Sequence, residues 1–416
     1  MTTQVIMISG KYPGGVRGGH ETFVRATARA ACSAGFEPHI FCTAPHAHVS
    51  QVDYGYVHYV ASPFRPFGSK MLPWQAPLLS AAVERFLEHK AGPHLVHAFC
   101  VWGYVAVTVS RRLKRKGAEV VSVINSYDIM AREARAKLSA LEGVHGLGNY
   151  SRYWREYLWQ KAVIQRYERY AYTRAQVVIV NYDTVRNLIL QTHGRRVHTR
   201  KLPYTSETAF LQSANGKVAS PASQLEPIAA LDNKDSPLIV TVSRHSPRKG
   251  LSYLIHALAL LRDSGVRFRA CLVGGGDLLV HHTKMIQRFG LQNVVAVTGI
   301  VPDSFAYLKQ ADIFALPSIE EGSGSLSIIE ALQAGKAIVA SNVDGIPEDI
   351  VDGESALLVK PGSARDLADA IGRLLSDASL RAKLGRSARS SFVEQFSPVT
   401  FAAAIKDLYA ELGFTP

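Results

Sequence analysis

Short runs of β-branched and apolar residues alternate with helical patterns along this chain, and the alternation occurs twice. Five runs precede Pro203: VIMIS (5–9), PHIFCT (38–43), HLVHA (94–98), EVVSVI (119–124) and VVIVN (177–181). Six runs follow it: LIVTVS (238–243), FRACLVG (268–274), VVAVTG (294–299), DIFALP (312–317), AIVAS (337–341) and ALLV (356–359). Strands joined by helical crossovers favour parallel sheets. The pattern therefore predicts an α/β chain with two Rossmann-like, doubly wound domains.

A stretch without clear periodicity separates the two series of strands. It covers residues 213–237 and is rich in Ser, Ala, Pro and Asn, which is typical of a linker or a surface excursion. We therefore expect an N-terminal domain over 1–205, a linker over 206–236 and a C-terminal domain over 237–397. Because no strands separate the closing helical segments, we expect the helix within 398–416 to pack back on the N-terminal domain.

The composition is that of an ordinary globular protein. The 416 residues, 47% hydrophobic and 19% charged, suffice for two domains with substantial cores. No run of about eighteen apolar residues occurs, and the start MTTQVIMISG lacks the features of a signal peptide, so we expect a cytoplasmic protein. Four cysteines are scattered without a CxxC pair, which predicts free thiols and no structural metal.

Positive charge is concentrated in the first half of the chain. Residues 1–202 hold 27 Lys and Arg against 12 Asp and Glu, whereas residues 203–416 hold 20 against 22. A basic half indicates a phosphate-bearing or acidic partner, an anionic membrane surface or nucleic acid. Nucleic acid is the weakest of these, because the run RRLKRKG (111–117) lies at a predicted helix end, where basic residues are usually solvated.

One predicted helix, over residues 151–174, combines basic and aromatic side chains. Six Lys and Arg stand against two Glu, interleaved with seven Tyr and Trp. The aromatics are spread too widely for a single core stripe, so some should lie at a surface that suits lipid headgroups or lines a binding cleft. Alternatively, the aromatics pack against the sheet and the arginines extend into solvent.

In doubly wound sheets, ligands bind beside the carboxyl ends of the strands, which directs attention to the loops that follow each strand. After the first strand comes GKYPGGVRGGHETF (10–23), whose Gly18 and Gly19 allow close approach to the backbone. Glu21 falls in the first turn of the next helix. The loop lacks G-x-G-x-x-G, which argues against a nicotinamide cofactor, and a flexible surface loop is the alternative.

Two cations follow the first strand of the second half, in RHSPRKG (244–250). Arg244 and Lys249 come just before an amphipathic helix, a placement that suits a pyrophosphate through charge-assisted hydrogen bonds. The next strand is followed by GGGD (274–277), where Gly275 again allows a close approach of the backbone. A solvated surface is the alternative for these cations.

Acids and glycines precede a helical pattern in EEGSGSLSIIEALQAGKAIVAS (320–341). The predicted helix begins near Leu326, so residues 322–325 lie where a helix N-terminus has free backbone N–H groups. Glu321 and Glu330 flank this start. Such a site suits an anion or a hydroxyl-rich ligand, because carboxylates make strong hydrogen bonds to hydroxyls.

Together these motifs resemble the retaining nucleotide-sugar glycosyltransferases of family 4, whose GT-B fold has two Rossmann-like domains facing across a cleft. The family's strand, Arg, four residues and Lys-Gly are similar to residues 243–250. Its PSxxEGxGxxxxEAxAxGxPVVAS resembles residues 317–341, and its GxPExVxxGxxxLLVxPG resembles residues 345–362. In the first half the resemblance is thinner and rests on the glycine-rich loop and on His97.

The resemblance implies a site for the donor in the second domain and for the acceptor in the first. Arg244 and Lys249 would hold the diphosphate and, with Glu321 facing the donor sugar, form the catalytic set. Glu330 would accept hydrogen bonds from the ribose. Other donor contacts would come from Gly18, Gly19, Gly275, Gly322, Ser323, Gly324, Ser325 and Leu326. Acceptor contacts would come from Glu21, His97, Asn125 and Asp128.

The sequence departs from the family pattern at three places. Eight residues separate Glu321 from Glu330, whereas the family has seven between its acids, so the GSGS loop carries one extra residue. Asn125 follows the strand after which the family often has His. LPYTSETAF (202–210) replaces the family's usual Pro-Asn-Gly. The sugar pocket and the acceptor contacts are therefore less firmly implied than the diphosphate site.

The implied reaction moves a sugar, with retained anomeric configuration, from a UDP- or GDP-linked donor to an acceptor hydroxyl. Neither a cofactor nor a metal is expected, because cations and helix dipoles would stabilise the leaving diphosphate. The acceptor is left open and includes lipid-linked or anionic molecules, with the protein at the inner membrane face. The alternatives are an epimerase or phosphorylase of the same fold and, less favoured, a protein that binds an anionic polymer.

Overall fold

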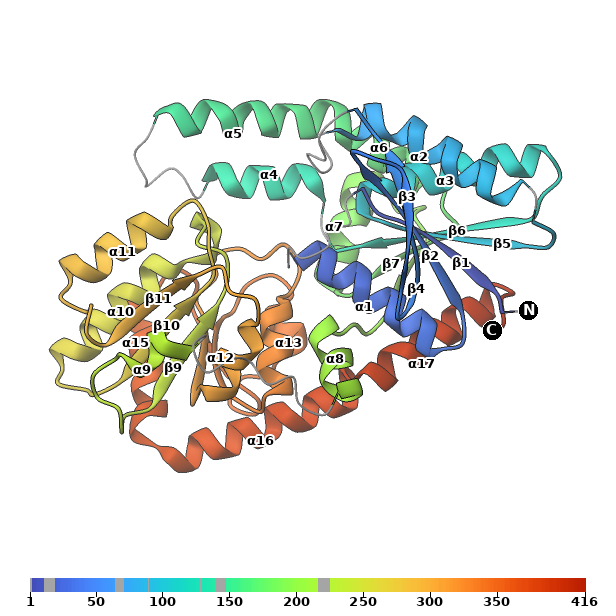
Figure 1. Cartoon of the computed structure of the whole chain (residues 1–416). Helices are drawn as coiled ribbons and strands as arrows, with labels where there is room; N and C mark the ends of the chain where they lie inside the picture. Colours follow the sequence, from blue (N-terminus) through green and yellow to red (C-terminus); the bar gives the residue numbers. More distant parts are fainter. Residues whose placement is uncertain are drawn as a thin grey trace. The chain divides into compact units, whose positions relative to one another are not determined.

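The structure, a computed structural model, describes residues 2–10, 19–63, 71–88, 90–127, 129–139, 147–215 and 225–416. It divides into two compact units, the first formed by Met1–Phe210 with Pro398–Pro416 and the second by Leu211–Ser397. Each unit holds one sheet with helices against it (Figure 1). The predicted α/β class with two doubly wound sheets is confirmed.

The sheet of the first unit has eight strands in the order β3-β4-β2-β1-β5-β6-β7-β8. Only the β3–β4 pair is antiparallel among these described strands. The strands are β1 (Gln4–Ile8), β2 (Glu37–Ala44), β3 (His48–Val52), β4 (Gly55–Ala61), β5 (His94–Phe99), β6 (Val120–Ser126), β7 (Val177–Val180) and β8 (Thr199–Lys201).

The helices of the first unit occupy most of the connections between these strands. They are α1 (Gly19–Ser33), α2 (Leu72–Leu87), α3 (Gly103–Arg115), α4 (Met130–Ser139), α5 (Leu147–Trp159), α6 (Gln165–Tyr172) and α7 (Asp183–His193). A short 3-10 turn, η2 (Cys100–Trp102), precedes α3, and α8 (Glu207–Asn215) follows β8. On one face of the sheet, Ile8 and Val96 share a buried cluster with Leu79 of α2 and Val105 of α3, so burial of apolar area holds these helices against the strands.

The helix predicted over residues 151–174 is present, with one irregularity. α5 continues through a π-helical segment, η3 (Gln160–Ile164), into α6. Its aromatics are divided, since Trp154 is 40% exposed whereas Tyr172 is buried. The prediction that some of them lie at the surface is therefore confirmed, while others pack inward as the alternative proposed.

The second unit has a six-stranded, fully parallel sheet in the order β11-β10-β9-β12-β13-β14. Its strands all match predicted runs: β9 (Leu238–Val242), β10 (Arg269–Val273), β11 (Val295–Gly299), β12 (Ile313–Leu316), β13 (Ala337–Ser341) and β14 (Leu357–Val359). Its helices are α9 (Glu226–Ala229), α10 (Leu251–Asp263), α11 (Leu279–Arg288), α12 (Ser304–Gln310), α13 (Leu326–Gln333), α14 (Ile346–Asp349), α15 (Ala364–Ser376) and α16 (Ala378–Gln395). A 3-10 turn, η5 (Pro247–Lys249), precedes α10.

The last helix belongs to the first unit. α17 (Pro398–Glu411) packs on α1, as expected for the end of the chain. Its Tyr409 is fully buried, with its hydroxyl 2.7 Å from Nδ1 of His97 and its ring edge-on to Phe36. Of the residues placed in the linker, 206–210 group with the first unit and 211–236 with the second.

Strand order marks one place in the second sheet where a ligand is expected. From β9 the chain proceeds to β10 and β11 on one side and then returns to β12 on the other. The loops after β9 and β12 consequently diverge from neighbouring strands at the carboxyl edge. This is the switch point beside which doubly wound sheets bind their ligands.

Candidate functional site

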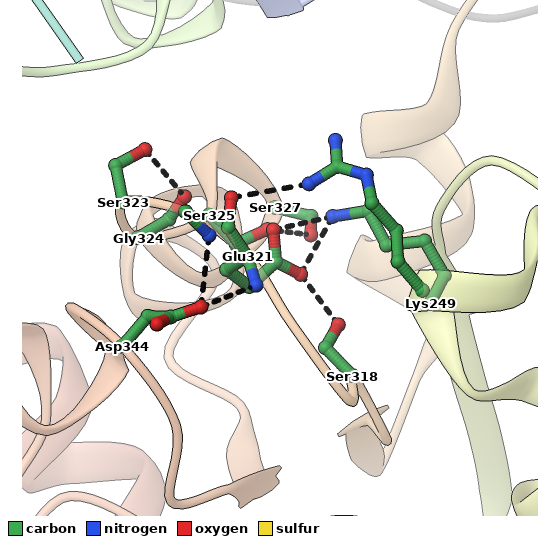
Figure 2. Close-up of polar contacts among 10 residues, drawn as sticks. Lys249, Ser318, Glu321, Ser323, Gly324, Ser325, Ser327 and Asp344 are labelled. Carbon is green, nitrogen blue, oxygen red and sulfur yellow. Dashed lines mark hydrogen bonds and ion pairs between the residues drawn. The ribbon is translucent and has the colours of Figure 1, made fainter. Parts of the chain in front are cut away.

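An ion pair joins the two loops at this switch point. Nζ of Lys249, from the loop after β9, lies 2.6 and 2.5 Å from the two carboxylate oxygens of Glu321, from the loop after β12 (Figure 2). The side chains are 12% and 3% exposed. A contact to both oxygens with so little solvent is a strong charge-assisted interaction. The structure thus brings together two of the three predicted catalytic residues.

The charge on Lys249 is held under opposing influences. Burial lowers the pKa of its ammonium below the usual range, Glu321 raises it, and Arg248 and Arg244 lower it. Arg244 itself is exposed at the end of β9. Positive charge therefore accumulates at this loop, and one carboxylate partly offsets it.

The backbone of the second loop is clamped by Arg248. Its guanidinium Nη1 donates to the carbonyl of Glu321 at 3.1 Å, and its own carbonyl accepts from the backbone N–H groups of Ile319 and Glu320. The Ser318 hydroxyl also donates to the Glu321 carboxylate. These contacts fix the position of the Glu321 side chain from both of its ends.

Gly250 explains how the two loops come so close. Its φ is +63°, and a Cβ built there would lie 2.0 Å from the carbonyl oxygen of Pro317. A side chain would therefore both strain the backbone and push the β12 loop away. Glycine is required at this position by packing between the loops.

Asp344 braces the acid- and glycine-rich loop from the other side. Its Oδ2 accepts from the backbone N–H of Glu321 at 2.7 Å and of Gly322 at 2.9 Å (Figure 2). The Gly345 N–H donates to the Ser323 carbonyl. Asp344 has φ +50°, an uncommon conformation for a residue with a side chain. Here Asp344 accepts the hydrogen bond of the Gly322 N–H, and the contact of Gly322 with the donor stays a prediction.

The helix that was predicted to begin near Leu326 does begin there, and most residues of its first turn are buried. α13 begins at Leu326 after Ser325, whose hydroxyl lies 2.9 Å from that of Ser327 rather than capping the helix. Glu330 lies on this helix and is 8% exposed. Its neighbours Ile329 and Ala331 are fully buried, so α13 holds this carboxylate rigidly.

The GGGD loop contacts the β9 loop through its backbone. His245 N–H donates to the Gly275 carbonyl at 2.9 Å. Nδ1 of His245 is 2.9 Å from Nδ1 of His282, and Nε2 of His282 is 3.2 Å from the Ser252 hydroxyl. Burial lowers the pKa of His245 to about 4 and of His282 to about 3, so both rings are neutral at pH 7. This histidine pair therefore links the loop after β9, which carries Arg244 and Lys249, to α11.

The structure describes some, but not all, of the site residues predicted in the first unit. Gly19 and Glu21 lie at the start of α1, while Gly18 and Asp128 fall outside the described residues. Asn125 and His97 are buried on neighbouring strands, and burial lowers the pKa of His97 to about 3 against a raising effect of Asn125. Because the His97 ring has no exposed surface and bonds Tyr409, the structure places it in the core. Its acceptor role stays a prediction.

Several contributors to the site were missed from the sequence. Arg248 and Asp344 contact the backbone of the β12 loop, whereas the Ser318 hydroxyl contacts the Glu321 carboxylate. The only available signal for the three was their position beside motif residues. His20, next to Gly19, was also missed: its Nε2 is 3.0 Å from the Ser9 hydroxyl, and its Nδ1 contacts the Tyr127 hydroxyl. Within the described ranges no group of three or more His, Cys, Asp or Glu is placed to hold a metal ion. No helix in those ranges is long and apolar enough to cross a membrane.

Comparison with known proteins matches both halves of the chain to glycosyltransferase families. The family model for glycosyl transferases group 1 matches residues 225–391, and that for the glycosyl transferase 4-like domain matches residues 18–205. The chain belongs to the group 1 glycosyltransferases. The first match contains the Lys249–Glu321 pair, and the second contains strands β2 to β8 of the first unit's sheet.

Two curated relatives illustrate the breadth of this family. The chain is 28% identical to an alpha-D-kanosaminyltransferase of Streptomyces kanamyceticus over 59% of its own length and 63% of the relative's. It is 31% identical to the GDP-mannose-dependent alpha-(1-6)-phosphatidylinositol monomannoside mannosyltransferase of Mycolicibacterium smegmatis, over 42% of its own length and 48% of the relative's. The matches thus span about half to two thirds of these relatives.

Solved structures match almost the entire fold. Sucrose-phosphate synthase from Thermosynechococcus elongatus superposes with a TM-score of 0.77 at 21% identity, covering 99% of each chain. HepE from Anabaena, in complex with UDP, superposes with a TM-score of 0.68 at 20% identity, covering 99% of this chain and 100% of its own. At these identities the likeness concerns the fold.

Proposed function

We propose that this group 1 glycosyltransferase transfers a sugar from a nucleoside diphosphate sugar to an acceptor hydroxyl with retention of anomeric configuration. The observation that carries the proposal is the buried Lys249–Glu321 pair with Arg244 beside it, at the switch point of the second sheet. A diphosphate at this edge would meet two cations, and a hydroxyl-rich sugar would meet a fixed carboxylate.

The chain's part in the reaction is electrostatic. The bond between the anomeric carbon and the diphosphate oxygen breaks, a bond from that carbon to the acceptor oxygen forms on the same face, and the acceptor's proton passes to the departing phosphate. Arg244 and Lys249 stabilise the charge that develops on the leaving diphosphate. This assignment requires neither a metal nor a cofactor.

The two acids have separate roles in the proposal. Glu330, fixed on α13, accepts hydrogen bonds from the ribose. Glu321 faces the donor sugar while its ion pair positions Lys249 toward the diphosphate. The remaining contacts to the donor come from Gly275, Gly322, Ser323, Gly324, Ser325 and Leu326, and those implied for Gly18 and Gly19 stay predictions.

Charge and family support an anionic or lipid-linked acceptor. The basic half of the chain favours phosphate-bearing molecules, and one relative is named for its action on a phosphatidylinositol monomannoside. We extend the proposal to an acceptor presented at the inner membrane face, bound through Glu21, Asn125 and neighbouring residues of the first unit.

A donor screen followed by product analysis tests this function. Melting temperatures with UDP, GDP and their sugars identify the nucleotide, because a ligand selective for the folded state raises the melting temperature. Incubation of the selected donor with candidate acceptors should then release free nucleoside diphosphate and form a glycoside, whose configuration NMR determines. A rearranged sugar nucleotide, or release of a sugar phosphate, would replace the proposal by an epimerase or a phosphorylase.

A further inference from the structure

A cavity of about 630 Å³ lies on the first unit, away from the residues assigned above. This cavity, the α3–α6 groove, lies between α3 and the helical segment formed by η3 and α6. α3 and α6 pack on one another. Tyr104, Thr108, Arg111 and Arg115 line one wall and recur every three to four residues, so they share one face of α3. The size is within the range of small-molecule sites, roughly 300–1,000 Å³.

Four guanidinium groups surround this cavity without a lining carboxylate. Arg111, Arg112 and Arg115 come from α3, and Arg166 comes from α6. Arg112 pairs with Glu84 of α2 at 2.9 Å, and Arg111 donates to the Tyr170 hydroxyl at 2.8 Å. Within the described part of the chain, the side chains of Arg115 and Arg166 have no hydrogen bond or ion pair. Like charges gathered from two helices disfavour one another unless an anion lies between them.

The rest of the lining supplies uncharged hydrogen-bond donors. The Tyr104 ring contacts those of Tyr167 and Tyr170, with centroids 4.7 and 5.3 Å apart. The Thr108 hydroxyl is buried and lacks a hydrogen-bond partner among the described residues. Burial raises the pKa of Tyr167, which keeps its hydroxyl protonated at neutral pH. The groove therefore offers guanidinium and hydroxyl donors together.

An ordinary solvated helix end explains only part of this arrangement. Cations in the last turn of α3 are favoured by the helix dipole, which accounts for Arg112 and Arg115. It does not account for Arg166 on another helix, for the tyrosines that line the same space, or for the unpartnered Thr108 hydroxyl. All three are explained by an anion with several acceptor oxygens.

We infer that this groove binds a phosphate-bearing ligand at a site distinct from the donor site. Several arginines match a phosphate group, which has three or four acceptor oxygens and one or two negative charges. The phosphate has two possible sources, an anionic phospholipid headgroup and a soluble phosphate ester. Exposed Trp154 and Leu158 on the adjoining α5, and Trp74 on α2, would contact acyl chains if the source is a lipid.

The test compares two double variants of the full chain that remove the same charge. Arg115→Gln with Arg166→Gln removes the two unpaired groove cations. Arg195→Gln with Arg196→Gln removes two exposed cations from the turn between α7 and β8 and serves as the matched control. Unchanged melting temperatures verify that both variants fold. Binding is measured at about 0.1 M salt, where long-range attraction between exposed charges is largely screened.

One arm uses sedimentation with phosphatidylcholine vesicles, with and without phosphatidylglycerol, and the other uses calorimetry with tripolyphosphate. We expect the groove variant to bind at least one of these anionic probes about tenfold or more weakly than the wild type, and the control to change less than twofold. Loss in the vesicle arm identifies a lipid headgroup, and loss in the calorimetric arm alone identifies a soluble ester. Equal losses in both variants, or a wild type that binds neither probe, would overturn the inference.

Discussion

The two units hold positive charge in opposite ways. In the second unit, Lys249 is buried against both oxygens of Glu321, and the loops around it are clamped by Arg248 and Asp344. In the first unit, the arginines of the α3–α6 groove are exposed and two have no partner within the described residues. A paired, buried cation is held in one geometry, whereas exposed arginines adapt to a ligand.

This difference predicts which substitutions should change both the stability of a unit and its ligand binding, and which should change binding alone. Removing a buried partner leaves the other charge without compensation, so the second unit should lose both activity and stability. Removing an exposed arginine should affect binding alone. The predictions below challenge this contrast, in order of decreasing expected effect.

The largest effect is expected at the two cations of the proposed donor site. Lys249→Ala should lower turnover by about 10²- to 10³-fold, because a preorganised contact to the leaving diphosphate is lost. It should also destabilise the second unit by about 3–5 kcal/mol, because the Glu321 carboxylate stays buried and unpaired. Steady-state kinetics and urea unfolding measure the two effects.

Arg244→Ala provides the matched comparison. Arg244 is exposed, so turnover should fall by a similar factor while the unfolding midpoint stays that of the wild type. Equal stability losses in both variants would contradict the contrast between paired and exposed cations. Normal kinetics in both would remove the diphosphate assignment altogether.

Substitutions of Glu330 and Glu321 should have different effects, the first on donor binding and the second on sugar transfer. Glu330→Gln should weaken every donor with the same ribose, whereas Glu321→Gln should mainly lower turnover and alter sugar choice, by about tenfold or more, because its amide no longer pairs with Lys249. Donor titrations and turnover measure this division. Glu320→Gln is the control, and greater damage there would show that Glu320, not Glu321, is the functional acid.

Much of the second unit was accessible from the sequence because four of its six strands, β9, β10, β12 and β13, are buried along almost their whole length. Runs such as LIVTVS and AIVAS are continuous and apolar, and all six coincide with strands. β3, β4 and β8 were missed for the opposite reason, since most of their side chains are partly or fully exposed and no continuous apolar run marks them. The family resemblance also implied a site that combines Arg244, Lys249 and Glu321, of which the structure brings Lys249 and Glu321 into contact.

What the sequence did not predict depends on contacts between distant loops. The clamp by Arg248 and the brace by Asp344 arise where backbone N–H and carbonyl groups come together in three dimensions, and neither leaves a periodic pattern. The packing role of Gly250 against Pro317 has the same origin. The return of the last helix to the first unit was expected, but the contact of Tyr409 with buried His97 depends on how that helix packs, which no pattern in the sequence marks.

Acid should destabilise both units through neutral buried histidines. His97 in the first unit and His282 in the second each have a folded pKa of about 3, below the unfolded value near 6.5. The unfolded chain therefore binds more protons below pH 6.5, and stability present above that pH is lost as pH falls toward the folded pKa. At pH 5 each histidine should cost about 2 kcal/mol.

Hydrogen exchange with mass spectrometry resolves the two units at pH 7.5 and 5.0. His282→Gln should flatten the pH dependence of the second unit and leave that of the first unchanged. A first unit that responds to His282→Gln as strongly as the second would break the comparison, because the two histidines lie in separately packed cores.

Asp344 should have a smaller, mainly functional effect. Asp344→Gly permits φ +50° but removes both hydrogen bonds to the loop, so turnover should fall by about tenfold, the equivalent of one to two net hydrogen bonds. Asp344→Asn tolerates the same φ and keeps an acceptor oxygen, and it should retain most activity. If the Gly variant is the more active one, Asp344 obstructs the donor rather than positioning the loop.

The smallest effect is expected at the buried His97–Tyr409 pair of the first unit. This pair resembles the Lys249–Glu321 pair of the second unit because its two side chains contact each other away from solvent. Tyr409→Phe removes one hydrogen bond and leaves Nδ1 of His97 buried without a partner, so the first unit should lose about 1–2 kcal/mol. Thermal unfolding measures this loss, and the rate of transfer over a range of acceptor concentrations measures function. If His97 is only a core residue, the acceptor dependence stays that of the wild type at a temperature where the variant is folded. A raised KM for the acceptor would instead restore the acceptor role predicted from the sequence, because freeing the ring from α17 would then change how it meets the ligand.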